Sequence, residues 1–152
     1  MTVHSYATHL VWSGSTRSGW ASYPRKHEAL APPAAARVDL SADPAFRGDA
    51  ERLNPEQLLV MAAASCQMLS FLALAARHRI DVVDYEEEAE GTMDDARRPA
   101  RIGHIRLAPV IRVAGGTDHE RVRELFAQAH ESCFIANSLT STVTLEPTVL
   151  DT

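Results

Sequence analysis

The stretch that decides the fold is NPEQLLVMAAASCQMLSFLALAA, residues 54–76, which has no charged side chain over the 20 positions from 57 to 76. Its first residues are typical of a helix start. Asn54 can cap the first turn, Pro55 suits the first helical position, and Gln57 stands where a capping box has Glu or Gln. The sequence therefore predicts a long helix from residue 55 onward, with Cys66 near its middle.

Apolar side chains cover nearly the whole circumference of this predicted helix. Twenty uncharged residues could also span a bilayer, but the alanines, two serines and Gln67 make insertion unfavourable. A helix that is apolar all round is buried on all sides, and one chain of this size hardly supplies the layers to cover it. We therefore expect no membrane span, and a homodimer in which a second copy buries part of the helix.

The composition is that of an acidic globular domain. The chain has 152 residues, 45% of them hydrophobic, and 20 acidic against 15 basic side chains give a net charge of -5. We therefore expect a single domain over residues 1–152 that binds neither nucleic acid nor an anionic membrane surface. The first residues show no signal segment, which favours a cytoplasmic protein. Two cysteines in a chain of this size favour reduced or redox-active thiols over a disulfide framework.

Strand patterns flank the long helix on both sides. Before it, a turn at 14–19 separates two stretches that alternate in polarity, which predicts an N-terminal hairpin. After it, the period-two pattern is longer and clearer. The predicted strands are 3–12, 19–25, a short one near Val38, 80–91, 104–113 and 142–149.

A second helix is predicted after Thr117, which forms a Thr-x-x-Glu capping box with Glu120. Apolar residues then follow on one stripe of this helix. They are Val122, Leu125, Phe126, Ala129 and Cys133. The order of strands and helices, with the two helices far apart, predicts an α+β fold with a mainly antiparallel sheet and a long buried central helix.

The residues alone leave the chemistry of the two cysteines open. Cys66 and Cys133 both fall on apolar helix faces, where a cysteine often only fills space. His130 lies one turn from Cys133, but a zinc site needs three or four ligands, so we predict no metal site. A G-x-S-x-G elbow and a phosphate-binding glycine loop are both missing, which argues against a serine hydrolase or a nucleotide-binding enzyme.

Two segments resemble the cysteine motifs of the OsmC/Ohr family, the osmotically inducible and organic hydroperoxide resistance proteins. The segments are ADPAFRGDAERLNPEQLLVMAAASC (42–66) and AHESCFIANSL (129–139). The resemblance extends over most of the chain and includes YPRKH (23–27) and GTM (91–93). It implies an intertwined α+β homodimer with the two long helices buried at its centre.

The resemblance implies roles for both thiols. Cys66 would be the peroxidatic cysteine, whose thiolate attacks the O–O bond and becomes a sulfenic acid, and Cys133 the resolving cysteine, which condenses with it into a disulfide. No cofactor is implied, because an external dithiol reductant such as a lipoyl protein or thioredoxin would restore the thiols.

The thiolate that this chemistry needs is disfavoured on an apolar helix, so we expect a cation near Cys66. In the family an arginine has this role and is oriented by the glutamate of the N-P-E motif, here Glu56. Arg25 resembles the arginine of the OsmC branch and Arg17 that of Ohr-type members; we favour Arg25. Gln67 stands where close relatives often carry histidine.

The resemblance and the apolar surroundings of Cys66 together predict an enzyme that reduces organic hydroperoxides. An apolar wall would concentrate alkyl or lipid peroxides by partitioning, at about 0.8 kcal/mol per buried methylene. The residues expected to form it are Met61, Met68, Leu69, Phe71 and Phe134. The alternative is a non-catalytic protein of the same fold that binds an apolar ligand and keeps its thiols inert.

Overall fold

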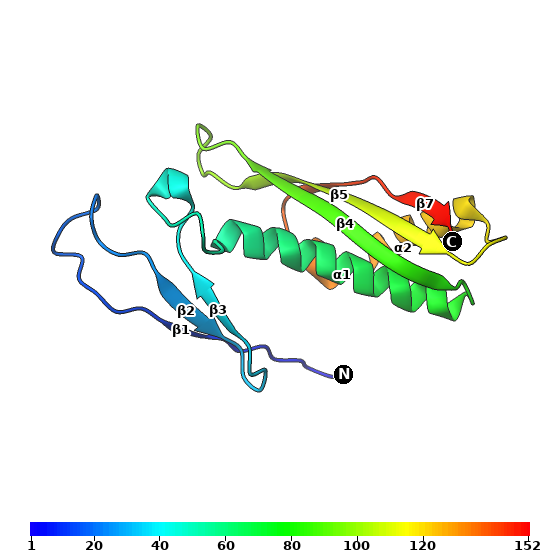
Figure 1. Ribbon diagram of the computed structural model, residues 1–152, viewed down its shortest axis with the longest axis horizontal. Coiled ribbons are helices and arrows are strands. Elements are labelled where there is room, and N and C mark those ends of the chain that lie inside the picture. Colours follow the sequence, from blue (N-terminus) through cyan, green and yellow to red (C-terminus); the bar gives the residue numbers. More distant parts are fainter. The chain divides into compact units, whose positions relative to one another are not determined.

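The computed structural model describes residues 1–152, which form two compact units, Met1–Leu58 and Leu59–Thr152. Its α+β composition, with antiparallel pairing and one long helix, confirms the predicted fold class (Figure 1). The elements in chain order are β1 (His9–Val11), β2 (His27–Leu30), β3 (Arg37–Leu40), the 3-10 turn η1 (Pro44–Phe46), α1 (Pro55–Arg77), β4 (Val82–Met93), β5 (Ile102–Val113), α2 (His119–Glu131), α3 (Phe134–Ser138), β6 (Thr142–Leu145) and β7 (Thr148–Asp151).

The first unit contains a small antiparallel sheet of β1, β2 and β3. The third strand lies where the sequence predicts a short one, but the predicted strand at 19–25 is wrong, because residues 12–26 form a loop. Arg25 donates to the carbonyls of Trp20 at 2.6 Å and Tyr23 at 2.7 Å. These carbonyls are satisfied inside the loop, so they do not need a neighbouring strand.

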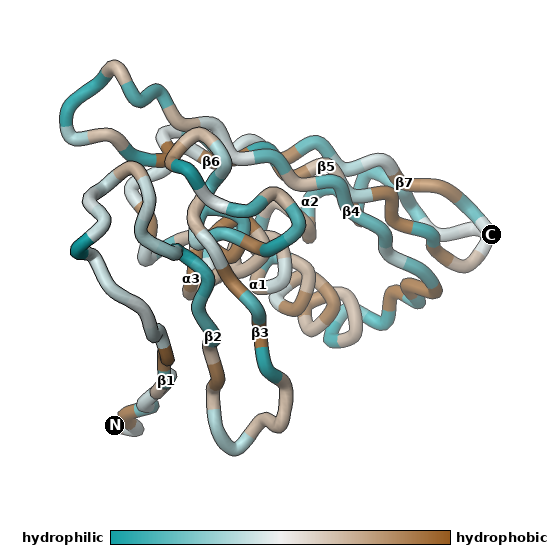
Figure 2. The backbone as a smooth tube through the Cα atoms, turned by 60° about the vertical axis from the view of Figure 1, so that its left-hand side comes forward, coloured by the Kyte–Doolittle hydropathy of each residue, from teal (hydrophilic) through white to brown (hydrophobic).

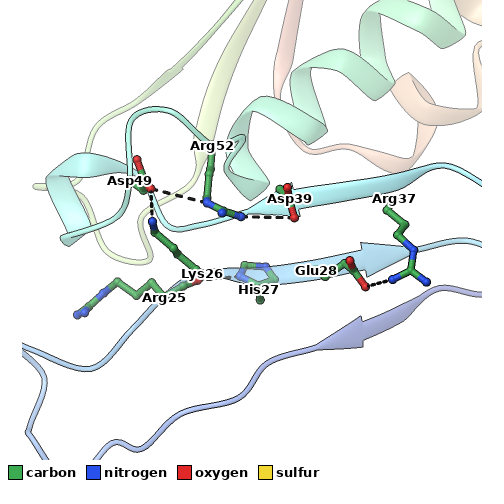
Figure 3. A network of polar contacts seen from close by, with 8 residues as sticks. All are labelled: Arg25, Lys26, His27, Glu28, Arg37, Asp39, Asp49 and Arg52. Atoms are coloured by element: carbon green, nitrogen blue, oxygen red, sulfur yellow. Dashed lines mark hydrogen bonds and ion pairs between the residues drawn. The ribbon is translucent and has the colours of Figure 1, made fainter.

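Ion pairs link the strands of the first unit to the loop that follows β3 (Figure 3). Lys26 lies 3.0 Å from Asp49, and its hydrogen bond lowers the pKa of that carboxyl. Arg52 reaches Asp39 at 3.4 Å and Asp49 at 3.7 Å. Figure 3 also shows Arg25 extending away from these pairs. Its guanidinium is therefore separate from the carboxylates of the network.

The loop after β3 closes tightly over Gly48. A Cβ built on Gly48 would lie only 1.5 Å from the carbonyl oxygen of Ala42, which is backbone and cannot turn aside. Gly48→Ala is therefore expected to lower the free energy of unfolding by about 3 kcal/mol, at the upper end of overpacking costs. Denaturant titration measures this. The control Gly103→Ala adds its methyl group where nothing lies within 4 Å; equal stability of the two variants would contradict the expectation.

The long helix α1 begins as predicted. The side chain of Asn54 accepts from the N–H of Gln57 at 2.8 Å, and the side chain of Gln57 accepts from the N–H of Asn54 at 3.0 Å. This reciprocal pair is the predicted capping box. One stripe of α1 is buried at every fourth residue. The buried side chains are those of Ala63, Gln67, Phe71 and Ala75.

The rest of the α1 surface remains apolar but open. The helix is long and apolar enough to cross a membrane by length and composition, and only 22% of its most apolar window is buried within this chain. Its path is mostly pale to brown on the hydropathy scale in Figure 2. The buried stripe shows that α1 packs as a core helix on one side, while its other sides lack a covering layer within the second unit.

The sheet of the second unit is built around β5. The strands β4 and β5 pair antiparallel along nearly their whole length, whereas β6 and β7 both run parallel to β5 and pair with successive halves of it. The sequence predicted one closing strand at 142–149. The structure has two, because Pro147 lies between them and has no N–H for the ladder.

Both long helices of the second unit contribute to one hydrophobic cluster with the sheet. Phe71 of α1 and Phe126 of α2 meet in it edge to face, with ring centroids 5.4 Å apart.

The cap of α2 differs from the prediction by one residue. Asp118, not Thr117, accepts from the N–H groups of the first turn. The hydroxyl of Thr117 donates instead to the carbonyl of Ala114.

The strand β4 carries a partly buried carboxyl group, that of Glu87. The hydroxyl of Tyr85 donates to one oxygen of Glu87 at 3.0 Å, and the other oxygen is buried without a partner. Burial raises the pKa of Glu87, against the opposing effect of the Tyr85 hydrogen bond. Since the folded pKa is raised, the stabilisation by the protonated form is present below the ordinary glutamate pKa of about 4.3 and is lost as pH rises through the folded value.

Glu87→Gln is therefore expected to unfold at a higher temperature than the wild type at neutral pH. The difference should shrink as pH falls, because the wild-type carboxyl becomes neutral as well. Thermal unfolding followed by circular dichroism across acidic to neutral pH measures this difference. If the difference in unfolding temperature between Glu87→Gln and the wild type does not change with pH, the carboxyl of Glu87 does not have the raised pKa that its burial predicts.

Candidate active site

Cys66 lies in the middle of α1 and is partly buried. The residues one turn away on the same helix face are small or apolar: Ala62 on one side and Leu69 and Ser70 on the other. The face around the thiol is therefore open enough for a ligand to approach, while its walls remain largely hydrocarbon.

Cys133 is fully buried and belongs to the turn between α2 and α3. The sequence predicted it on the last turn of the second helix, but α2 ends at Glu131 and Cys133 caps α3 instead. Its N–H donates to the carbonyl of His130 at 3.2 Å, and its carbonyl accepts from the N–H of Asn137 at 3.0 Å. This turn places the Cys133 thiol close enough to Cys66 for each thiol to shift the pKa of the other. Both thiols are free.

The surroundings of Cys66 favour its thiolate. Burial alone would raise the pKa of the Cys66 thiol. Hydrogen bonds from the backbone N–H of Ile135 and from the Cys133 thiol outweigh burial, together with the Phe134 N–H and the Ser70 hydroxyl, so the pKa is lowered. These uncharged donors within the second unit are sufficient for the direction of the shift, and the expected cation near Cys66 stays a prediction.

Cys133 behaves in the opposite way. Burial raises its pKa, and the hydrogen bond with Cys66 and the repulsion of a Cys66 thiolate raise it further. The backbone N–H groups of Ala136 and Ile135 oppose this only in part. The pair is thus asymmetric: Cys66 ionises first and Cys133 remains a thiol beside it.

A pocket of about 470 Å³ opens beside Cys66. Its wall combines one face of α1 with the first residues of α3. The lining residues are Ala62, Ser65, Cys66, Leu69, Ser70, Phe134 and Ile135. Two of the residues predicted for this wall, Leu69 and Phe134, are in it, and both have exposed side chains.

The other three predicted wall residues do not line this pocket. Met61, Met68 and Phe71 are five residues before, two after and five after Cys66, and these offsets point away from the Cys66 face. Phe71 is fully buried in the core. The residues that the sequence analysis missed include Ala62 and Ser70, and the helical offsets of four could have identified them.

The remaining predicted residues, Arg17, Arg25 and Glu56, belong to the first unit, whereas both cysteines belong to the second. Arg17 is exposed, and Glu56 lies in the first turn of α1. Arg25 makes several contacts: its guanidinium lies 4.0 Å above the ring of Tyr23 and donates to two loop carbonyls. The assignment of any of the three to Cys66 stays a prediction.

The first unit has a pocket of its own, of about 530 Å³, which the sequence did not indicate. Aromatic side chains and Arg25 dominate its wall. The lining residues are Trp12, Thr16, Tyr23, Arg25, His27, Ser41, Ala42 and Pro55. A guanidinium within an apolar wall suits a ligand with an apolar body and a negative or polar end.

The structure shows no candidate metal site, because no group of three or more His, Cys, Asp or Glu side chains is placed to hold a metal ion.

The fold is shared with solved structures of known proteins. An OsmC-like protein of unknown function from Vibrio cholerae is 25% identical, with a TM-score of 0.85 over 95% of this chain and 99% of that one. The organic hydroperoxide resistance protein OsmC of Legionella pneumophila is 18% identical, with a TM-score of 0.72 over 98% of each chain. The organic hydroperoxide resistance protein OhrB of Bacillus subtilis is 20% identical, with a TM-score of 0.61 over 97% of this chain and 98% of that one.

No curated protein matches the chain. The two hydroperoxide resistance proteins are distant enough that their likeness shows the fold alone. The family comparison reaches further, because residues 48–148 match the OsmC-like protein family, a range that includes both cysteines and the whole of α1. The resemblance seen in the sequence is thereby confirmed, and the chain belongs to the OsmC-like protein family.

Proposed function

We propose that the protein is a thiol-dependent peroxidase that reduces organic hydroperoxides. One observation carries the proposal: the Cys66 thiol, whose pKa is lowered, adjoins the buried Cys133 thiol at the wall of an apolar pocket. The fold shared with organic hydroperoxide resistance proteins supports it. A buried inert cysteine would have a raised pKa and no second thiol beside it.

The chemistry runs in two steps that need no bound cofactor. The Cys66 thiolate attacks one oxygen of the hydroperoxide, the O–O bond breaks, and the second oxygen leaves as an alkoxide that takes up a proton to give the alcohol. Cys66 is then a sulfenic acid. The Cys133 thiol attacks this sulfur, water leaves, and a Cys66–Cys133 disulfide forms. An external dithiol returns both residues to thiols.

The pocket argues for a hydroperoxide with a hydrocarbon body. Leu69, Phe134 and Ile135 supply apolar walls beside the thiol, and the volume suits a small organic molecule. Hydrogen peroxide has no apolar surface to bury there, so it gains nothing from these walls. The proposed substrate class is therefore alkyl or lipid hydroperoxides.

The experiment that tests the proposal compares cumene hydroperoxide with hydrogen peroxide in the presence of excess dithiothreitol. We expect turnover of both, with a higher kcat/KM for cumene hydroperoxide. Equal rates for the two peroxides would remove the proposed selectivity. If neither peroxide is turned over, the proposed peroxidase activity is excluded, and a non-catalytic protein that binds an apolar ligand is favoured instead.

Arg25 is the proposed cation for the reaction, with Glu56 as the residue that orients it. Its support is the match of YPRKH to the family pattern and the fixed position of its guanidinium over Tyr23. Arg25→Met is expected to reduce kcat/KM about tenfold or more, since an adjacent cation favours the thiolate by roughly this much. Arg17→Met is the matched variant and should stay near the wild type. The reverse result would transfer the role to Arg17.

We also propose that the protein acts as a homodimer. The apolar side chain of Met61 on α1 is 47% exposed within one chain, and only 22% of the most apolar window of this helix is buried. A second copy of the same helix would cover such a surface, and two-fold dimers are the commonest solution. Sedimentation equilibrium is expected to give twice the chain mass, and Met61→Lys to shift it toward the monomer. A monomeric wild type would exclude the dimer.

The reductant in this proposal is a protein dithiol such as a lipoyl domain or thioredoxin, in the cytoplasm. A dithiol suits the step because it reduces a disulfide through a mixed disulfide and then closes on itself. Reduction assays with purified lipoylated protein, thioredoxin and glutathione, each at the same thiol concentration, would identify which of them supports turnover.

A further inference from the structure

Gln67, the residue directly after Cys66, is a fully buried polar side chain in the middle of an apolar helix. Its amide nitrogen donates to the carbonyl of Phe126 at 2.8 Å, and its amide oxygen lies 3.2 Å from Nδ1 of His130. Burying an amide without partners is costly. Both ends of this amide are satisfied, and both partners belong to α2, one helical turn apart.

The hydrogen bonds fix the orientation of both side chains. A carbonyl can only accept, so the group that faces Phe126 must be the NH₂ of Gln67 and the group that faces His130 must be its oxygen. That oxygen can only accept in turn. His130 therefore carries a proton on Nδ1, whether the imidazole is neutral or charged.

One further hydrogen bond connects this pair to the second cysteine. The carbonyl of His130 accepts the backbone N–H of Cys133 at 3.2 Å. Gln67 is covalently next to Cys66, so a short path runs from Cys66 through Gln67 and His130 to Cys133. Apart from the contacts of Cys66 itself, the bonds of Gln67 are the only side-chain hydrogen bonds from α1 to the α2–α3 segment.

We propose that the Gln67–His130 hydrogen bond is a positioning device that holds the Cys133 turn against Cys66 for disulfide formation. The inference rests on the proposed disulfide chemistry of the two thiols. In that step Cys133 must attack the Cys66 sulfur along the line of the departing oxygen, and water leaves. A small displacement of the turn would slow this attack without changing the reaction of Cys66 with the peroxide, which does not involve Cys133 as a nucleophile.

The test uses four full-length variants. Gln67→Met keeps a similar volume but has no amide, and His130→Leu removes the donor. His130→Asn keeps a donor because the Asn side-chain nitrogen lies close to the position of Nδ1. His119→Leu is the control: it makes the same change on the same helix, at a histidine that pairs with Asp151 instead.

The first measurement needs no peroxide. Each variant is equilibrated with mixtures of reduced and oxidised dithiothreitol, and the fraction of Cys66–Cys133 disulfide is measured by mass spectrometry. Two protein thiols lose electrons as the oxidised dithiothreitol gains them. Gln67→Met and His130→Leu are expected to lower the disulfide equilibrium constant about tenfold, the effect of losing a buried hydrogen bond. His130→Asn and His119→Leu should stay within about threefold of the wild type.

The second measurement separates the two chemical steps with cumene hydroperoxide in a stopped-flow instrument. Disulfide formation is expected to slow about tenfold in Gln67→Met and His130→Leu, and sulfenic acid formation much less. Unchanged disulfide formation in both variants, or an equal loss in His130→Asn and His130→Leu, would overturn the proposal. The wild type could fail to react with cumene hydroperoxide while the disulfide equilibrium constants of the variants still differ from the wild type as expected. In that case the peroxidase proposal fails and the positioning role stands.

Discussion

Cys66→Ser is expected to reduce kcat/KM for cumene hydroperoxide at least about a thousandfold, because a hydroxyl at this place cannot replace the thiolate as nucleophile. Cys133→Ser is expected to behave differently. It should consume one equivalent of hydroperoxide and then stop, or continue only slowly with a small thiol, because its Cys66 sulfenic acid has no resolving partner. The measurement is hydroperoxide consumption together with dimedone labelling of the sulfenic acid.

The two variants form a matched pair, since each replaces one sulfur by oxygen in the same contact. Dimedone should label Cys133→Ser strongly after oxidation and Cys66→Ser not at all. Full turnover by Cys66→Ser would remove this residue from the nucleophile role. Labelling of Cys66→Ser at Cys133 would mean that the assignment of peroxidatic and resolving cysteine is reversed.

The second large effect is expected from the backbone donor at Ile135. Ile135→Pro removes the N–H that favours the Cys66 thiolate, and proline is tolerated in the first turn of a helix, where Ile135 lies in α3. A hydrogen bond to a charged group contributes about 1.5–3 kcal/mol, which corresponds to roughly one to two pKa units. The pKa of Cys66 should therefore rise and the reaction rate at neutral pH fall about tenfold or more.

The matched control for this variant is Ile135→Ala, which loses the same side-chain packing but keeps the N–H. The reaction rate should rise with pH through the Cys66 pKa in every variant. In Ile135→Pro that rise should be displaced to higher pH, whereas in Ile135→Ala it should coincide with the wild type. Thiolate absorbance and iodoacetamide alkylation measure the midpoint. Equal midpoints in the two variants would show that this N–H does not stabilise the thiolate.

The elements with strong local signals could be predicted from the sequence. The start of α1 was readable because Asn54 and Gln57 cap each other through side chains. The strand predicted at 19–25 failed because the carbonyls of this segment bind the Arg25 guanidinium, an interaction between side chain and backbone that periodicity does not report. The parallel pairing of β6 and β7 with β5 depends on contacts between distant segments, which no local pattern encodes.

Only part of the candidate site could be predicted from the sequence. The two cysteines and the exposed wall residues Leu69 and Phe134 could be named from the sequence and the family resemblance. The donors that lower the Cys66 pKa could not, because every residue carries a backbone N–H and only the fold decides which ones face the thiol. The sequence identifies Gln67 only as a polar residue in an apolar run and as a departure from histidine. Its bond to His130 joins residues 63 positions apart and is visible only in three dimensions.

The most direct test of the account is the fate of the two thiols after one turnover without reductant. The reduced wild-type protein is mixed with one equivalent of cumene hydroperoxide and analysed by mass spectrometry and peptide mapping. We expect one equivalent of cumyl alcohol and a Cys66–Cys133 disulfide, with the protein two hydrogens lighter. Two free thiols beside intact hydroperoxide would contradict it.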